Sequence, residues 1–334
     1  MKMLKSLFLC SLLTTTAFFI SSCDNDDDDV TPTDQTIVGV AASNANFSIL
    51  VAAIQNVSAN TGTNVAALLS DETQKFTVFA PTNDAFIAAG LDQSFVSNPS
   101  NAQAVLDVLT YHVIGAAVKA SEVPAGPNAA QKAISNQDLF LTRDSRGVFV
   151  NGIPVATADV NATNGVIHAI PTVLMPPSGN IVETAVAANF NLLVAAIQYV
   201  DAELNAGIAT ALSGSGPFTV FAPTDAAFIA ALDGADGSTK DNAVSTAELQ
   251  ALGASAIAAI LQAHVVPGRV FSSDLTNGLK PSTLNTGADI TINLSGDVAT
   301  IAGAGNTAAK PAITATNVVT TNGVIHIINQ VILP

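Results

Sequence analysis

The feature that most constrains the fold is a set of four short sequence blocks that occurs twice in the same order. The matching blocks are residues 46–55 and 189–198, 76–82 and 218–224, 111–113 and 263–265, and 164–168 and 322–326. The copies are about 140–160 residues apart, whereas solenoid repeats recur about every 20–50 residues. The chain is therefore predicted to contain two copies of one globular domain.

The N-terminus has the pattern of a secretion signal. Lys2 and Lys5 precede an apolar stretch at 7–20 that is too short to span a bilayer. The stretch ends in Ile20-Ser21-Ser22-Cys23, which resembles a bacterial lipobox. We predict that residues 1–22 are a lipoprotein signal peptide and that Cys23 carries acyl chains such as palmitate. The alternative is ordinary signal cleavage beside an incidental cysteine.

An acidic segment follows the predicted anchor. Residues 23–35 contain an aspartate run at 26–29, and such like-charge runs stay extended and solvated. The run resembles the stretch that directs lipoproteins of Bacteroidetes-type bacteria to the cell surface. We expect an outer-membrane, lipid-anchored protein at the cell surface, with a periplasm-facing orientation as the alternative. Only Cys23 would remain after cleavage, since Cys10 lies in the signal peptide, so no intrachain disulfide is expected.

Charge and hydropathy exclude several classes of partner. The formal net charge is −15, which argues against nucleic acid, because nucleic acids are bound through basic patches. Hydrophobic residues make up 49% of the chain and charged residues 11%, so material for a core is ample. The predicted contact with the membrane is the lipidated cysteine alone.

Local patterns predict both helices and strands in each copy. Residues 47, 50, 51 and 54 share one helical face, and 190–197 repeat this spacing. Phe76-Thr77-Val78-Phe79 predicts a short strand that Pro81 ends, and Thr82 suits the N-cap of a following helix. Asn164-Gly165 and Asn322-Gly323 predict hairpin turns, because both residue types tolerate positive φ.

These blocks resemble the two signatures and the central Tyr-His pair of the fasciclin domain. The resemblance covers residues 36–175 and 181–334, with 176–180 as the linker. It implies an α+β fold with two tandem domains, each a wedge-shaped β-sandwich with packed helices. It also implies a secreted or surface-anchored protein that mediates adhesion.

The resemblance suggests one weak partner-binding position. Some adhesive family members carry an integrin-binding Asp-Ile pair just before the second signature. Asp159 and Val160 match it nearly, whereas the second copy has Asn317-Val318 and lacks the acid. Ala263 also replaces the tyrosine of the Tyr-His pair. These departures weaken the case for animal-type receptor binding, more in the second copy than in the first.

All four histidines fall inside repeated blocks. None has a partner at i+3 or i+4 as a helical metal motif would require. We expect structural roles for them, as imidazoles satisfied by hydrogen bonds on half-buried strands, rather than metal or catalytic roles. These residues are His112, His168, His264 and His326.

Other chemical motifs are incomplete, so we predict no catalytic residues, no metal site and no cofactor. Gly253-Ala254-Ser255-Ala256-Ile257 lacks the second glycine of a nucleophile elbow. Residues 303–308 resemble a dinucleotide fingerprint, but Pro311 prevents the helix it requires. Asp233, Asp236 and Asp241 match no calcium loop and are expected in a solvated loop.

The sequence as a whole favours a non-enzymatic, lipid-anchored protein of the cell surface that acts in adhesion or extracellular-matrix interaction. Its protein or glycan partner is not identified by any motif. One alternative is a polysaccharide-binding or uptake accessory lipoprotein. A second alternative is a hydrolase built on a fasciclin scaffold.

Overall fold

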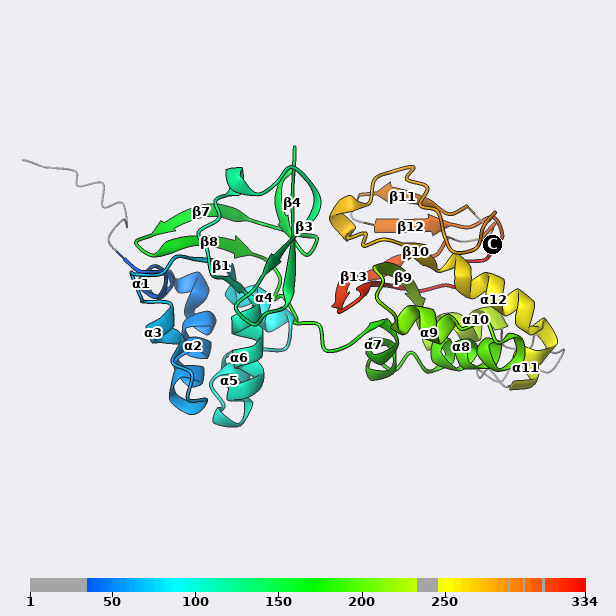
Figure 1. Cartoon of the computed structure of the whole chain (residues 1–334), viewed down its shortest axis with the longest axis horizontal. Helices are drawn as coiled ribbons and strands as arrows, with labels where there is room; N and C mark the ends of the chain where they lie inside the picture. Colours follow the sequence, from blue (N-terminus) through cyan, green and yellow to red (C-terminus); the bar gives the residue numbers. More distant parts are fainter. Residues whose placement is uncertain (1–34, 233–245, 288, 297, 308–309) are drawn as a thin grey trace, which may run out of the picture. The chain divides into compact units, whose positions relative to one another are not determined.

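The computed structural model describes residues 35–232, 246–287, 289–296, 298–307 and 310–334 (Figure 1). The predicted signal peptide, Cys23 and the loop with Asp233, Asp236 and Asp241 lie outside these residues. Two modules follow one another along the described chain, and their main elements come in the same order.

The first module begins with helices and ends with the strand that carries its Asn-Gly block. Its helices are α1 (Ile37–Ser43), α2 (Ser48–Asn60), α3 (Val65–Leu68), α4 (Asn83–Ala88), α5 (Gln93–Val96) and α6 (Ala102–Tyr111), with 3-10 turns η1 (Ala45–Phe47), η2 (Pro99–Asn101) and η3 (Ala120–Glu122). Its strands are β1 (Phe76–Pro81), β2 (Val113–Ile114), β3 (Gly126–Lys132), β4 (Asp138–Asp144), β5 (Gly147–Val150), β6 (Ile153–Pro154), β7 (Thr157–Ala162) and β8 (Gly165–Ile170).

The second module repeats this order within its described residues. Its helices are α7 (Ile181–Ala187), α8 (Asn191–Leu204), α9 (Ile208–Ser213), α10 (Asp225–Leu232), α11 (Thr246–Leu252) and α12 (Ala254–Ala263), with the 3-10 turn η4 (Ser272–Asp274). Its strands are β9 (Phe218–Pro223), β10 (Val265–Pro267), β11 (Thr291–Ser295), β12 (Val298–Ala302), β13 (Ile313–Thr320) and β14 (Gly323–Ile328).

The central sheet of each module pairs the two signature strands in the same register. Its order is β2-β1-β8-β7 in the first module and β10-β9-β14-β13 in the second. β1 runs parallel to β8 with Phe76 opposite Gly165, and β9 runs parallel to β14 with Phe218 opposite Gly323. Two blocks that are far apart in the sequence therefore form adjacent strands at the centre of each module.

Each central sheet is covered on both faces. In the first module, Val78 and Ile167 pack into the core on the helical side, whereas Phe79 and Ile170 pack on the side of the second sheet, β3-β4-β5-β6. In the second module the helices again cover one face, and the hairpin β11-β12 lies over the other (Figure 1). All six residues of β8 are buried as a result. The expected α+β fold is confirmed.

Several local predictions are also confirmed. Leu50 and Ile54 are buried on one face of α2, and Pro81 is the last residue of β1. The Thr82 side chain caps α4 by accepting a hydrogen bond from the Ala85 N–H at 3.3 Å. Thr224 makes the corresponding bond to the Ala227 N–H at 3.2 Å.

The Asn-Gly hairpin forms, but its asparagine has an unexpected role. Ala162 pairs with Gly165, so Thr163 and Asn164 form the turn, and of the Asn-Gly pair only the glycine has positive φ, at +154°. Asn164 is fully buried. Its Oδ1 accepts from the Ile37 N–H at 2.9 Å, and its Nδ2 donates to the Leu69 carbonyl at 2.8 Å. The side chain therefore joins the start of α1 to the end of α3.

The second module makes the same connection through Asn322. Its Oδ1 accepts from the Ile181 N–H at 2.9 Å, and its Nδ2 donates to the carbonyls of Leu212 and Gly214 at 2.7 Å each. The following glycine is required in both modules for a steric reason: a Cβ at Gly165 or Gly323 would overlap the carbonyl oxygen of the opposite strand residue.

Among the described helices, none is by itself long and apolar enough to cross a membrane. The segments Ile37–Ser43 and Ala45–Asn60 meet that test only when taken together, and they meet at a bend of 109°.

Replacing either buried asparagine should weaken its module. We expect Asn164→Ala and Asn322→Ala each to lower the free energy of unfolding by about 2–4 kcal/mol, because each leaves buried backbone groups without partners. Denaturant unfolding measures this effect. Asn161→Ala is the control: Asn161 lies exposed in the same hairpin, and its loss should change stability by less than about 0.5 kcal/mol. A loss of stability in Asn164→Ala no larger than that in Asn161→Ala would contradict the role assigned to Asn164.

Candidate functional site

His112 and His264 occupy the same position in the two modules. They are the C-cap residues of α6 and α12, and both are buried. The expectation that the histidines lie on half-buried strands is therefore wrong for these two. Each stands where a helix leads directly into the edge strand of the central sheet, so its ring points into the core between the helices and the sheet.

Both ring nitrogens of each of these histidines are hydrogen-bonded. The Nδ1 of His112 lies 2.7 Å from the Val108 carbonyl, and its Nε2 accepts from the Leu174 N–H at 2.9 Å. His264 has the same pair of bonds, to the Ile260 carbonyl at 2.7 Å and from the Ile332 N–H at 2.9 Å. Since Nδ1 faces an acceptor and Nε2 faces a donor, only the neutral tautomer with its proton on Nδ1 fits. Burial lowers the pKa of both histidines to about 4.

His168 and His326 lie on the strands β8 and β14, as expected, but both side chains are buried rather than half-buried, and the Nδ1 of His326 has no hydrogen-bond partner. Their Nε2 atoms are each 2.9 Å from a backbone carbonyl, that of Val118 or Val270. The His168 ring stacks on Phe79 at 5.5 Å, and the His326 ring stacks on Phe221 at 5.6 Å. All four histidines thus have at least one ring nitrogen tied to the backbone, a geometry that suits a scaffold.

The two modules differ chemically at the position of Tyr111. It is fully buried between the two sheets of the first module, and its hydroxyl donates to the Asp138 carbonyl at 3.0 Å. The same hydroxyl accepts from the Asn151 amide at 3.0 Å. Burial raises the pKa of Tyr111 to about 12. Ala263 takes this position in the second module and offers no polar group to the opposite sheet.

Asp159 is held by contacts within its own module. It lies at a bulge in β7 with φ of +58°, and its Oδ1 accepts from the Ala120 N–H at 2.8 Å. Its backbone N–H donates to His168 Nδ1 at 3.3 Å. Val160 is half-buried and packs against the helical core. Asp159 therefore connects the bulge to the first residue of η3.

Asn317 does the same in the second module. It also lies at a bulge, with φ of +63°, and its Oδ1 accepts from the Ser272 N–H at 2.8 Å. Ser272 is the first residue of η4, as Ala120 is of η3. The acid is therefore not needed for this local structure, since an amide oxygen supports the same turn.

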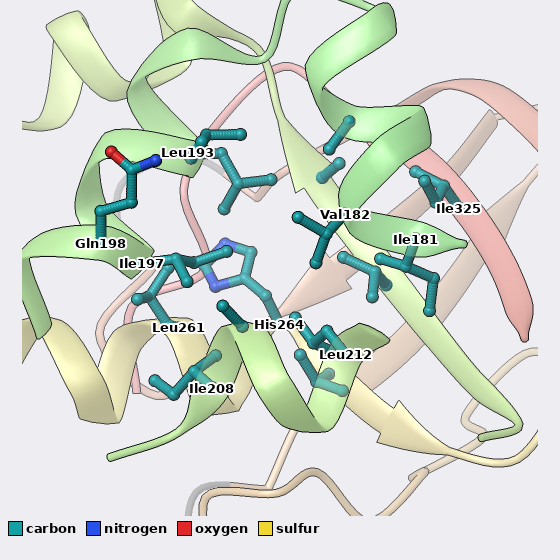
Figure 2. A pocket seen from close by; sticks show the side chains of 16 residues that line it. Ile181, Val182, Leu193, Ile197, Gln198, Ile208, Leu212, Leu261, His264 and Ile325 are labelled. Atoms are coloured by element: carbon teal, nitrogen blue, oxygen red, sulfur yellow. The ribbon is translucent and has the colours of Figure 1, made fainter. Parts of the chain in front are cut away.

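An apolar cavity of about 80 Å³ lies inside the second module. Its walls come from α7, α8, α9, α12 and the central sheet, and Figure 2 shows the side chains that surround it. The polar members of the lining are Gln198 and His264. No sequence pattern predicts this cavity, because its lining consists of ordinary core residues.

The first module has a matching cavity of only about 20 Å³. Every residue that lines it has a counterpart of the same type in the larger cavity, for example Ala41 and Ala185, Leu109 and Leu261.

The third helix differs between the modules. Asn64 caps α3 through the Ala67 N–H, whereas Asp201 of α8 accepts from the N–H groups of Ile208 and Ala209 at the start of α9.

Within the part of the chain that the structure describes, no group of three His, Cys, Asp or Glu residues is placed to hold a metal ion.

The shared geometry of the modules agrees with a comparison to known families. The fasciclin domain model matches residues 45–176 and 189–334. The chain belongs to the fasciclin domain family. The two central strands of each fasciclin module are thus the segments by which the sequence resembled the family.

Several fasciclin relatives are similar over part of their length. Protein sll1483 of Synechocystis is 42% identical over 150 residues, which is 44% of this chain and 77% of that protein. Transforming growth factor-beta-induced protein ig-h3 of Sus scrofa is 29% identical over 82% of this chain. The chain spans only 38% of the length of ig-h3.

Two further comparisons concern a bacterial relative and a solved structure. Cell surface glycolipoprotein MPB83 of Mycobacterium bovis is 29% identical over 42% of this chain and 61% of that protein. A solved FAS1 domain pair from the insect cell adhesion molecule Fasciclin I aligns with 87% of this chain and 98% of its own, with a TM-score of 0.40 and 18% identity.

Acid should destabilise the protein through the buried histidines. Because the pKa of His112 and His264 is about 4 when folded and 6.5 when unfolded, the unfolded state binds more protons below pH 6.5. Their contribution is complete above pH 6.5 and is lost as the pH falls toward 4. At pH 5 each should cost on the order of 2 kcal/mol of stability. Denaturant unfolding of the wild type and of His112→Gln tests this, and an identical pH dependence in both would contradict it.

Two substitutions of Asp159 distinguish its role in the local turn from any contact that its charge makes with a partner. We expect Asp159→Asn to fold with stability within about 0.5 kcal/mol of the wild type, because Asn317 supports the same turn, whereas Asp159→Ala should lose about 1 kcal/mol. Thermal unfolding provides the comparison. A loss of stability in Asp159→Asn as large as that in Asp159→Ala would show that the charge itself is required.

The difference between the two cavities predicts opposite effects of one substitution. Ala185→Val should leave stability unchanged or raise it, because the added methyl groups enter free space. Ala41→Val at the matching site should cost about 1–3 kcal/mol through overpacking. Denaturant midpoints of the two variants test this, and equal destabilisation would contradict the asymmetry.

Proposed function

We propose that this protein is anchored by lipid at Cys23 and displays two fasciclin modules on the outer cell surface, where they mediate adhesion or matrix contact without enzymatic activity. The observation that carries the proposal is the pair of equivalent modules behind one N-terminal cysteine and an acidic segment. The name of the relative MPB83, a cell surface glycolipoprotein, supports both the anchor and the location. Membership of the fasciclin family supports the adhesive role.

The mechanism we propose is presentation. The acidic segment at residues 23–35 would act as the spacer between the membrane and the modules, since a run of like charges disfavours compact packing. Contacts that are weak for one module then add through avidity when many copies face the same surface. The buried, backbone-bonded histidines fit this role, because they strengthen the scaffold and leave its surface free for contact.

Protease shaving of intact cells of the native host tests the proposal. We expect peptides from both modules in the released fraction, and acyl chains on the N-terminal peptide that begins at Cys23. Replacing Cys23 by Ala should release the protein from the membrane fraction and lower cell attachment to a matrix-coated surface. Protection of both modules from protease would overturn surface display.

The adhesive part of the proposal has its own control. Asp159→Asn retains the local turn and removes only the negative charge, so cells that display it report directly on a charged contact with a partner. A fall in attachment of tenfold or more would assign that contact to Asp159. Attachment that is unchanged by deletion of the whole protein, combined with binding of the purified chain to polysaccharide, would favour the glycan alternative. Turnover of an ester or glycan substrate by the purified chain would contradict the non-enzymatic role.

A further inference from the structure

The cavity in the second module is an internal feature that the scaffold role and surface display leave unexplained. We propose that it binds a single unbranched alkyl chain that belongs to an uncharged amphiphile. The chain would enter between α7, α8 and α9 and end beside the His264 ring.

The walls offer almost nothing to a polar ligand. Apart from Gln198 and His264, the side chains that line the cavity are aliphatic. Both ring nitrogens of His264 already bond to the backbone, so the ring offers no free hydrogen-bonding group to the cavity. A buried water needs two to four polar partners, and a cavity without them stays dry or takes apolar molecules. The interior of this cavity therefore suits hydrocarbon.

The second module also offers a path from the surface. Val182, Val194 and Ala209 line the cavity from three helices and are only half-buried, and the neighbouring Gln198 is exposed. The smaller cavity of the first module does not extend to the matching residues, which are Val38, Val51, Ala66 and Gln55. The larger cavity thus reaches the module surface where the smaller one stays within the core.

The size of the cavity favours a chain end. At roughly 30 Å³ for a group the size of a water molecule, about 80 Å³ holds two or three methylene groups. The terminal carbons of a linear chain fit this space. The remaining carbons would lie along the half-buried aliphatic side chains at the entrance.

The charges on the helices that line the entrance argue against an anionic head group, and the uncharged Gln198 amide beside it favours a neutral one. The helices α7, α8 and α9 carry Glu183, Asp201 and Glu203 and contain no lysine or arginine. An anionic head group would therefore be repelled, and no basic side chain on these helices would pair with it. The exposed Gln198 amide can donate to, or accept from, a neutral hydroxyl. An alcohol or glycol head meets these conditions.

Titration of the full mature chain with 1-octanol, followed by NMR of methyl groups, tests the proposal. We expect saturable shifts at Leu193, Ile197 and Leu261, with intermolecular contacts from the terminal methyl of the octanol. Octanoate should bind at least tenfold more weakly. Across 1-butanol to 1-octanol, each added methylene should tighten binding by up to about fourfold until the cavity and its entrance are filled.

The matched alanine variants locate the site. Ala185→Val should weaken 1-octanol binding at least tenfold, and Ala41→Val should leave it within twofold of the wild type. If Ala185→Val does not fold, the intermolecular contacts in the wild type still decide the matter. Shifts that do not saturate, or that appear equally at Ile54 and Ile167 of the first module, would overturn the proposal. Surface display is judged by protease shaving, so either idea can fail alone.

Discussion

The side-chain amide of one buried asparagine holds together the parts of each module. Asn164 accepts from the first N–H of α1, donates to the carbonyl that ends α3, and through its own carbonyl accepts from the Phe76 N–H at the start of β1. Asn322 makes the same three connections in the second module. These segments are far apart in the sequence, so a residue at the tip of a hairpin connects two helices and a strand of its module. The glycine that follows lets the opposite strand approach closely enough to complete the arrangement.

A second constraint follows from a sheet that is buried on both faces. Polar groups in such a sheet need partners within the fold. His168, His326 and the bulge residues Asp159 and Asn317 lie in these sheets and bond to backbone groups of neighbouring segments, although the Nδ1 of His326 has no partner. The chemistry that these residue types could have supplied is thus used to stabilise the fold.

The sequence predicted the features that depend on local pattern or on repetition. The duplication, the α2 face, the strand ended by Pro81 and the Thr82 cap all follow from neighbouring residues, and all are present. The role of Asn164 could not be predicted this way, because a turn preference says nothing about hydrogen bonds to residues about a hundred positions away. His112 and His264 were misplaced on strands since a helix ends directly before each short edge strand. The larger cavity of the second module could not be predicted from the sequence, because the corresponding lining residues of the two modules are of the same types.

Native-state hydrogen exchange of the Ile37 and Ile181 amides tests the central role of the asparagines most directly. Amides in the first turn of a helix normally exchange through local fraying, because they lack a partner within the helix. These two donate to the Asn164 and Asn322 side chains instead, so each should exchange as slowly as the core amides of β1 or β9, through unfolding of the whole module. Exchange of both amides orders of magnitude faster than those strand amides would show that the asparagines do not hold the modules together.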